Sequence, residues 1–186
     1  MTKEPHSIII QNAQKGDDYA MHQLYLLYGK AMLNTAYRIL NNREDAEDAL
    51  QDAFIKMYAR LDQFKYKSTF GAWLKRIVVN QSIDALKKKR AIVFLNDEHL
   101  PVREPDSLPS HQENDLQEKL DGFYRSLHQL PDGYRTVLSL YLLEGYDHQE
   151  IAQILDIEVS TSISQLSRAK KKLQSLTSKA INNGQS

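Results

Sequence analysis

The sequence predicts an all-α protein with two small helical domains joined by a flexible acidic linker. Most long segments repeat their apolar residues at intervals of three and four, which is the spacing of one helical face. Strand signals are nearly absent, and the Asp-Gly pair Asp132-Gly133, which is typical of hairpin turns, has helical flanks. A proline-containing stretch without periodicity covers residues 91–115 and is typical of a linker. We therefore expect domains at residues 1–90 and 116–186.

Composition limits the functions that are open to this chain. Its 186 residues are 41% hydrophobic and 26% charged, with a formal net charge of zero, as in ordinary globular proteins. The absence of cysteine excludes disulfides, thiolate metal sites and thiol catalysis. No apolar run approaches the length of a membrane span and no cleavage-like site follows the run Ser7–Ile10, so we expect a cytoplasmic protein without direct membrane insertion.

Two helices are predicted before residue 41, the first from about Ser7 to Lys15 and the second from Asp17 or Asp18. Aspartate favours a helix start because its carboxylate accepts hydrogen bonds from the first backbone amides. The pattern then breaks at Asn41 and Asn42. The expected packing stripe of the second helix consists of Leu24, Leu27, Tyr28, Ala31, Leu33 and Tyr37.

Residues 43–61 form the next predicted helix, which is acidic. Glu44, Asp45 and Glu47 lie near its start, where the helix dipole favours negative charge. The expected buried stripe is Ala46, Ala49, Leu50, Ala53, Met57 and Leu61, and the expected outer face is Asp48, Gln51, Asp52 and Ile55. An apolar residue with a charged rim is typical of protein-contact surfaces, although single exposed apolar residues are common everywhere.

The stretch from Phe64 to Arg90 combines an aromatic loop with a basic helix. Residues 65–90 hold eight lysines and arginines against one acid, Asp84. Such a charge is typical of a phosphate-binding surface, although a solvated helix face would also explain it. The expected core face is Phe70, Trp73, Leu74, Ile77 and Gln81, and the expected exposed ridge is Arg76, Asn80, Ile83 and Lys87.

The loop before this helix favours nucleic acid over a plain solvated face. Its aromatic rings alternate with cations in the order Phe64, Lys65, Tyr66, Lys67, and the same alternation continues at Phe70 and Lys75. Unpaired bases stack on rings while nearby cations neutralise the phosphates. The linker is expected to stay off DNA, since residues 91–121 carry eight acidic and two basic side chains.

The second domain is predicted to end in a helix-turn-helix. A first helix, with Leu116, Leu120, Phe123, Leu127 and Leu130 at helical spacing, ends at Pro131, and a second runs from about Asp132 to Glu144 before Gly145. Asp147 and Glu150 have the spacing of a capping box at the start of a third helix. After a break at residues 156–158, a basic helix is expected from Ser160 to Ser178. Two helices joined by a tight turn, the second one basic, indicate binding to duplex DNA.

Three motifs in this order resemble the extracytoplasmic-function (ECF) sigma factors of the sigma-70 family, from about Asp17 to Leu173. They are DAEDALQDAFIK at residues 45–56, FKYKSTFGAWLKRIVVN at residues 64–80, and LPDGYRTVL followed by QEIAQIL and SQLSRAKKKL in the second domain. The resemblance implies a specificity subunit, and not an enzyme, that directs core RNA polymerase to promoters and helps to melt the minus-ten element. It implies no cofactor and no metal. Its implied partners are core RNA polymerase, promoter DNA as duplex and as melted non-template strand, and an anti-sigma factor.

The resemblance also implies three sets of contact residues. The polymerase-binding set is Asp48, Gln51, Asp52 and Ile55. The minus-ten set is Phe64, Lys65, Tyr66, Lys67, Ser68, Arg76, Asn80 and Lys87. The minus-thirty-five set is Ser160, Thr161, Ser164, Gln165, Arg168 and Lys171.

One segment departs from the family pattern. Relatives usually have a Ser-Glu-Gly-Thr run before the recognition helix and a lysine shortly after it, whereas this chain has Glu158 at the cap position, Ser160 at the small residue and Ile163 at the basic contact. The loss of a cation and the gain of an acid predict weaker or altered minus-thirty-five recognition, with Ser160 taking over as the cap.

Two other classes of function remain as alternatives. A conventional helix-turn-helix regulator would use the second domain alone and would leave the acidic helix and the aromatic loop without a role. A helical-bundle metalloenzyme is disfavoured because the six histidines are scattered and none pairs with a glutamate at the three-residue spacing of such sites.

Overall fold

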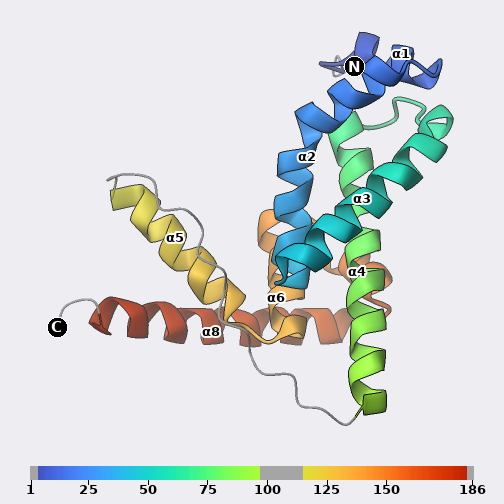
Figure 1. Cartoon of the computed structure of the whole chain (residues 1–186). Helices are drawn as coiled ribbons and strands as arrows, with labels where there is room; N and C mark the ends of the chain where they lie inside the picture. Colours follow the sequence, from blue (N-terminus) through green and yellow to red (C-terminus); the bar gives the residue numbers. More distant parts are fainter. Residues whose placement is uncertain (1–3, 97–114, 184–186) are drawn as a thin grey trace. The chain divides into compact units, whose positions relative to one another are not determined.

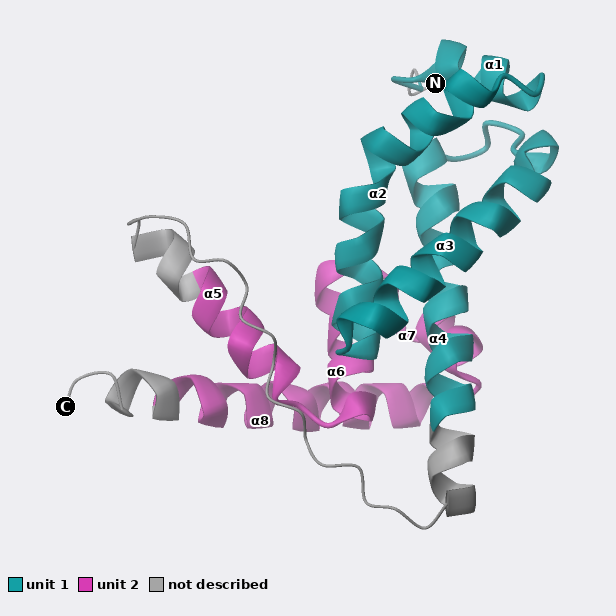
Figure 2. Cartoon of the chain, in the orientation of Figure 1, with its two compact units in different colours: residues 1–92 teal, residues 93–186 magenta. Residues whose placement is uncertain are grey.

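The fold is entirely helical in the part of the chain that the structure describes (Figure 1). The computed structural model describes the backbone of residues 4–96 and 115–183, and the side chains of residues 4–89 and 120–178. The chain divides into two compact units, residues 1–92 and 93–186 (Figure 2). The prediction of an all-α fold is confirmed. Residues 97–114, most of the predicted linker, lie outside the described residues.

Unit 1 contains four α-helices in its described residues. They are α1 (Ser7–Gln14), α2 (Asp18–Leu40), α3 (Arg43–Ala59) and α4 (Phe70–Asn96), with a short 3-10 helix, η1 (Leu61–Gln63), before the aromatic loop. Helix α4 therefore extends past the expected boundary at residue 90. In Figure 1, α2, α3 and α4 lie side by side and α1 crosses one end of them.

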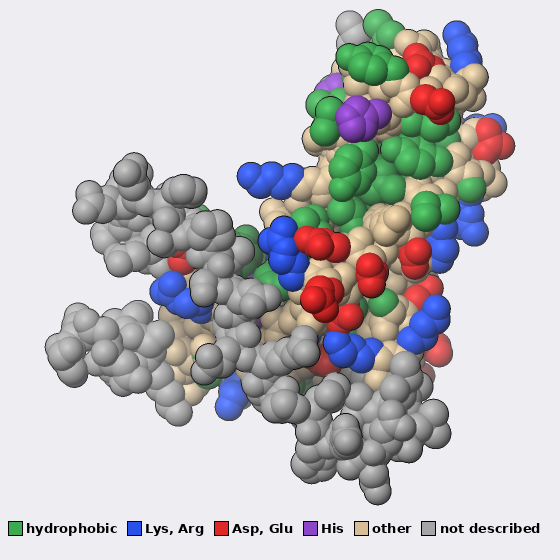
Figure 3. Space-filling view, viewed as in Figure 1, with side chains coloured by type: hydrophobic (Ala, Val, Ile, Leu, Met, Phe, Trp, Pro, Cys, Tyr) green, Lys and Arg blue, Asp and Glu red, His purple; other side chains and the backbone are tan. Residues whose placement is uncertain are grey.

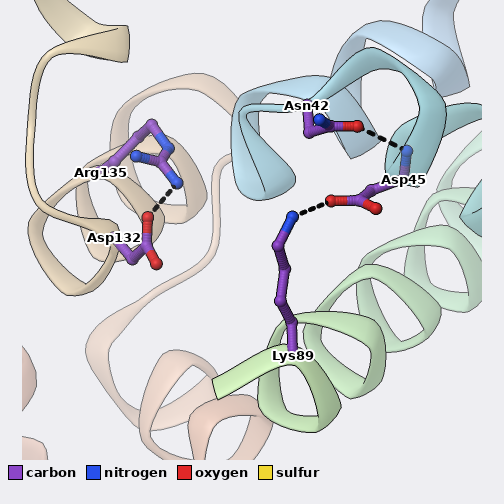
Figure 4. A network of polar contacts seen from close by, with 5 residues as sticks. All are labelled: Asn42, Asp45, Lys89, Asp132 and Arg135. Carbon is purple, nitrogen blue, oxygen red and sulfur yellow. Dashed lines mark hydrogen bonds and ion pairs between the residues drawn. The ribbon is translucent and has the colours of Figure 1, made fainter. Parts of the chain in front are cut away.

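Local capping explains where the helices of unit 1 begin and end. The Asp17 carboxylate accepts from the Tyr19 amide at 2.9 Å and so caps α2. Asn41 ends α2 in the left-handed conformation, with φ of 53°. The next residue starts α3, because the Asn42 side chain accepts from the Asp45 amide at 2.9 Å (Figure 4). Two asparagines thus make the sharp turn between two long helices.

The core of unit 1 agrees with the prediction for α3 and differs for α2. All six residues of the predicted α3 stripe, with Leu61 in η1, are buried. On α2, however, Leu27 is 47% exposed and Ala31 is also exposed. Helix α2 carries apolar residues around most of its circumference, so spacing alone did not select the buried side. The apolar residues buried on α2 are Ala20, Leu24, Met32, Ala36, Ile39 and Leu40.

Unit 2 has four α-helices in its described part. They are α5 (Asp115–His128), α6 (Asp132–Leu138), α7 (His148–Leu155) and α8 (Val159–Asn183). A five-residue π-helix, η2 (Ser139–Leu143), continues α6, and Gly145 follows it with φ of +81°. The predicted capping box is confirmed, since the Glu150 amide donates to Asp147 at 2.8 Å and the Asp147 amide donates to Glu150 at 3.0 Å. The apolar core of unit 2 centres on Leu127, Leu138, Leu140, Ile151 and Leu166.

The start of α8 corrects one expectation. Asp156 ends α7 with φ of 58°, and α8 begins at Val159, so that Glu158 occupies the cap position. The Ser162 amide already donates to the Glu158 carbonyl at 3.1 Å. Ser160 is therefore inside the first turn and does not serve as the cap, because the helix begins earlier than the residue pattern suggested.

Candidate protein and nucleic-acid interfaces

The acidic face of α3 points away from the core of unit 1. Asp48, Gln51, Asp52 and Ile55 are all exposed, and the side chain of Ile55 is 59% exposed. At 100° per residue these four positions lie opposite the buried stripe. Acidic side chains gather in one area of the space-filling view, beside an exposed apolar area (Figure 3). The residues predicted for protein contact therefore share one accessible surface, which we call the α3 face.

A polar relay connects the α3 face to α4. The buried Gln81 side chain donates from Nε2 to Asp52 Oδ2 at 2.9 Å, and its Oε1 accepts from Lys56 Nζ. Farther along, Lys89 of α4 forms an ion pair with Asp45 of α3 (Figure 4). These contacts fix the acidic helix against the basic helix at two places. Sequence spacing had placed Gln81 on the core face without identifying its partners.

The aromatic loop, residues 64–69, separates buried from exposed side chains. Lys65, Tyr66, Lys67 and Ser68 are exposed, and the Tyr66 ring is 42% exposed. Phe64 differs from the expected exposed set, because it is only 3% exposed. Its ring lies 4.7 Å from Tyr66, 5.5 Å from Phe70 and 5.4 Å from Trp73 between centroids. Phe64 is thus the buried support beneath Tyr66, since the neighbouring rings cover it.

The exposed side of α4 is narrower than the sequence suggested. Arg76, Asn80 and Lys87 are exposed along one line, as expected. Ile83 was expected on the same ridge, but it is only 3% exposed. The reason is that α4 buries more than half of its circumference, including Val79, so its basic ridge is bounded by core residues on both sides. The three polar side chains that remain form a stripe leading away from the loop.

The basic helix α8 exposes some of its predicted contact residues and packs others. Ser160, Arg168 and Lys171 are exposed, whereas Thr161, Ser164 and Gln165 are partly buried. The Ser164 hydroxyl donates to the Thr161 carbonyl at 3.0 Å. The Gln165 side chain faces α6, where a methyl group at Gly133 would lie 3.4 Å from Gln165 Oε1. Ile163, in the place of the usual cation, is 51% exposed.

Comparisons with known proteins account for both units. Residues 24–92 match the family model of Sigma-70 region 2, and residues 120–173 match that of Sigma-70, region 4. The chain is 30% identical over 174 residues to the ECF RNA polymerase sigma factor SigW of Bacillus subtilis, a match that covers 89% of this chain and 92% of that protein. The chain belongs to the ECF sigma factors. As a member of this family, it directs RNA polymerase to promoters in transcription initiation.

This sigma factor is also similar to a second curated relative and to a solved structure. The ECF RNA polymerase sigma-E factor of Escherichia coli K12 is 31% identical over 174 residues, covering 88% of this chain and 90% of that protein. The solved structure of the sigma factor RpoE in complex with the anti-sigma factor NepR from Bartonella quintana has a TM-score of 0.60 and 27% identity, covering 83% of this chain and 94% of that one. Fold and sequence therefore agree along nearly the whole chain.

Several structural contacts of the sigma factor were not visible in its sequence. His148 Nδ1 lies 2.9 Å from the Ser162 hydroxyl, a contact between the two helices of the helix-turn-helix. The His148 ring also stacks on Tyr141 with centroids 4.7 Å apart. Burial raises the pKa of Tyr58, whose hydroxyl donates to the Met21 carbonyl at 2.7 Å and ties α3 to α2. Each of these pairs joins two different helices, so the spacing of residues along one helix carries no signal for them.

The described part of the sigma factor contains neither a candidate metal site nor a candidate membrane-spanning helix. No group of three or more histidine or acidic side chains there could hold a metal ion. None of the helices described is long and apolar enough to cross a membrane.

Proposed function

We propose that unit 1 of this sigma factor binds core RNA polymerase through the α3 face and takes up the melted minus-ten element on the aromatic loop and α4. The observation that carries the proposal is the presence in one unit of two accessible surfaces of opposite character. The α3 face exposes acids around Ile55, while the loop and α4 expose cations around Tyr66. Protein contact suits the first surface and nucleic acid suits the second.

Polymerase binding by the α3 face rests on Ile55 as an apolar anchor. An exposed apolar side chain within a charged rim gains binding energy when a partner covers it, and the rim charges select a basic partner surface. The relay through Gln81 holds the Asp52 carboxylate in place before binding, so less side-chain entropy is lost in the complex. Reversing the charge of Asp52 should therefore weaken the complex strongly.

Strand opening on this chain requires binding and no covalent chemistry, so we propose that it has no enzymatic activity. The exposed Tyr66 ring, supported from below by Phe64, offers a stacking surface to an unpaired base. Base stacking on an aromatic ring contributes about 1–3 kcal/mol, and Lys65 and Lys67 neutralise the adjoining phosphates. Arg76, Asn80 and Lys87 continue this path along α4. Opening is thus favoured by capture of the melted state.

Unit 2 is proposed to contact the minus-thirty-five element through α8. Arg168 and Lys171 are exposed cations suited to phosphates, and Ser160 lies on the same side of the helix. At position 163 an apolar side chain replaces the usual cation. We expect Ile163→Lys to tighten binding of the holoenzyme to promoter DNA, with a steeper salt dependence. Equal affinity of the two proteins at matched salt would contradict this role for position 163.

Regulation by an anti-sigma factor in the cytoplasm is part of the same proposal. The solved relative RpoE is held in a complex with an anti-sigma factor, and this chain shares its fold over most of its length. We therefore propose a protein partner that covers contact surfaces of this chain until a signal releases it.

The experiment that tests the minus-ten role compares Tyr66→Ala with Tyr19→Ala. Tyr19 is a matched control, because it is 69% exposed on α2 and lies outside both proposed surfaces. A promoter would first be recovered from a random-sequence library by transcription with the unaltered holoenzyme. We expect Tyr66→Ala to lower the rate of strand opening at least about tenfold, as loss of one stacked base predicts, with unchanged affinity for core polymerase.

The same experiment separates the proposal from its alternative. Opening at the unaltered rate in Tyr66→Ala would contradict the role of the loop. Binding to duplex DNA without any association with polymerase would instead indicate a conventional helix-turn-helix regulator.

A further inference from the structure

We propose that the amino-terminal segment, residues 4–14, is a clamp that fixes the conformation of the aromatic loop for base capture. This inference rests on the proposed minus-ten function. The segment lies before residue 24, where the match to Sigma-70 region 2 begins. It nevertheless holds the loop at both ends, through Gln14 and Glu4. These two side chains act as positioning residues and touch no DNA.

Gln14, the last residue of α1, holds the beginning of the loop. Its Nε2 donates to the Leu61 carbonyl at 2.8 Å and to the Phe64 carbonyl at 3.3 Å. Its Oε1 lies 3.5 Å from the Tyr66 hydroxyl, at the limit of a hydrogen bond. One amide side chain therefore contacts three residues that lie about fifty positions away. Both Nε2 protons are directed at backbone oxygens, a role that a glutamate of the same shape could not fill.

The loop needs this support because its backbone is strained at Tyr66. Tyr66 has φ of 56°, in the left-handed region that a bulky side chain rarely adopts. The conformation is stabilised by contacts that exist only in the folded unit, namely the Phe64 ring beneath Tyr66 and Gln14 beside it. Without them the loop would relax toward ordinary backbone geometry. The Tyr66 ring would then leave the position from which it stacks on a base.

Glu4 holds the other end of the loop. Its carboxylate accepts from the Phe70 backbone amide at 2.9 Å, at the first residue of α4. The first amides of a helix lack partners within the helix, and a negative charge is favoured there. His6 strengthens the attachment, since its Nδ1 lies 2.9 Å from the hydroxyl of Tyr28, whose ring packs against Phe70. Burial, and secondarily Glu4, raise the pKa of Tyr28, which keeps this hydroxyl protonated.

The clamp lowers the conformational entropy that the loop loses when a base stacks on it. A loop that is already in its binding conformation loses little freedom when a base stacks on it, so capture is stronger for the same contacts. A loop released at one end would have to be ordered in each binding event. Loss of the clamp should therefore slow strand opening while leaving the α3 face, and so the affinity for polymerase, unchanged.

The test compares Gln14→Glu with Gln11→Glu in the full chain. Gln14→Glu keeps the shape but turns an oxygen toward the carbonyls of Leu61 and Phe64. Gln11→Glu is the matched control, because Gln11 is exposed on the same helix and the change of charge is identical. Two readouts apply to the free protein: amide hydrogen exchange of residues 64–70, and quenching of Trp73, the one tryptophan, which packs on Phe64. Two more apply to the holoenzyme: strand opening and polymerase affinity.

We expect Gln14→Glu to speed loop exchange and to slow strand opening, each about tenfold, with unaltered polymerase affinity. Gln11→Glu should match the unaltered protein in all four measurements. If Gln14→Glu does not fold, Gln14→Ala removes the donors without adding charge and should give the same pattern at smaller size.

The outcomes separate this inference from the function on which it rests. If Tyr66→Ala slows opening and Gln14→Glu does not, the clamp is overturned and the role of the loop stands. If Tyr66→Ala has no effect on opening, the proposed role of the loop fails and, with it, the clamp's role in base capture. Loop exchange that is unaltered in Gln14→Glu would overturn the clamp in either case.

Discussion

The two units of this sigma factor bury different kinds of side chain. In the described residues of unit 1, the buried polar side chains are Thr35, Gln81 and Ser82, within a large apolar and aromatic core. In those of unit 2, fewer apolar residues are buried, and they surround a larger polar set. That set comprises Ser126, His128, Arg135, Thr136, Ser139 and Ser162. Unit 1 is therefore stabilised by apolar and ring packing, whereas polar side chains make up a larger share of the core of unit 2.

Arg135 illustrates what the difference means. Its side chain is 1% exposed, although it carries a positive charge and lies in the small core of unit 2. Nη1 donates to the Leu130 carbonyl at 2.9 Å, and Nη2 forms an ion pair with Asp132 at 2.6 Å (Figure 4). The guanidinium thus joins the end of α5 to the start of α6. A small apolar core tolerates such a charge only because its donors are satisfied.

The largest effect is expected from a substitution that disrupts the ring packing of unit 1. Phe70 is fully buried, and its ring lies 5.1 Å from Tyr28 and 5.7 Å from Trp73. Phe70→Ala should lower the stability of unit 1 by about 4 kcal/mol, because it removes a large ring and leaves a cavity. Denaturant unfolding followed by Trp73 emission measures unit 1 alone. A loss below about 1 kcal/mol would contradict the proposed importance of ring packing.

The next prediction concerns the polar core of unit 2. Arg135→Met should lower the stability of unit 2 by about 3 kcal/mol, because it removes a buried donor to the Leu130 carbonyl and the ion pair with Asp132. Helix content should then be lost in a separate, earlier transition by circular dichroism, while the Trp73 transition stays where it was. Arg125→Met is the control, because Arg125 is exposed on α5. Equal stability of the two variants would show that the buried charge is dispensable.

The smallest effect tests whether local capping matters in unit 2. Asp147→Ala removes the cap of α7 and should lower stability by about 1 kcal/mol. Gln149→Ala, at an exposed position of the same helix, should change it little. Thermal unfolding, together with amide exchange in α7, measures the stability of the two variants. A loss of stability as large as that of Arg135→Met would mean that capping contributes as much as the buried Arg135 to the stability of unit 2, which would contradict this ranking.

Sequence reasoning predicted the features that depend on local pattern. The α3 stripe, the Asn41-Asn42 break and the Asp147-Glu150 box each involve residues within a few positions of one another, and the structure confirms each of them. The exposure of the α3 face followed for the same reason. Its role in binding stays a proposal.

Features set by distant contacts could not be predicted in this way. Phe64 and Ile83 were expected at the surface and are buried. The rings of Tyr66, Phe70 and Trp73 cover Phe64, which the spacing of residues along one helix does not report. The same limit applies to Gln14, whose partners lie about fifty residues away, and to the burial of Arg135. Helical spacing reports which side of a helix is apolar, but not how much of the other side is covered.

The measurement that tests the central proposal most directly is the affinity of this sigma factor for core RNA polymerase. Asp52→Lys would be compared with Asp18→Lys, an equal charge reversal at an exposed position of α2. We expect Asp52→Lys to raise the Kd at least about tenfold, because it places a cation within an acidic contact surface, and Asp18→Lys to leave it unchanged. Trp73 emission would show that both variants are folded. Equal binding by the unaltered chain and Asp52→Lys would contradict polymerase binding through the α3 face.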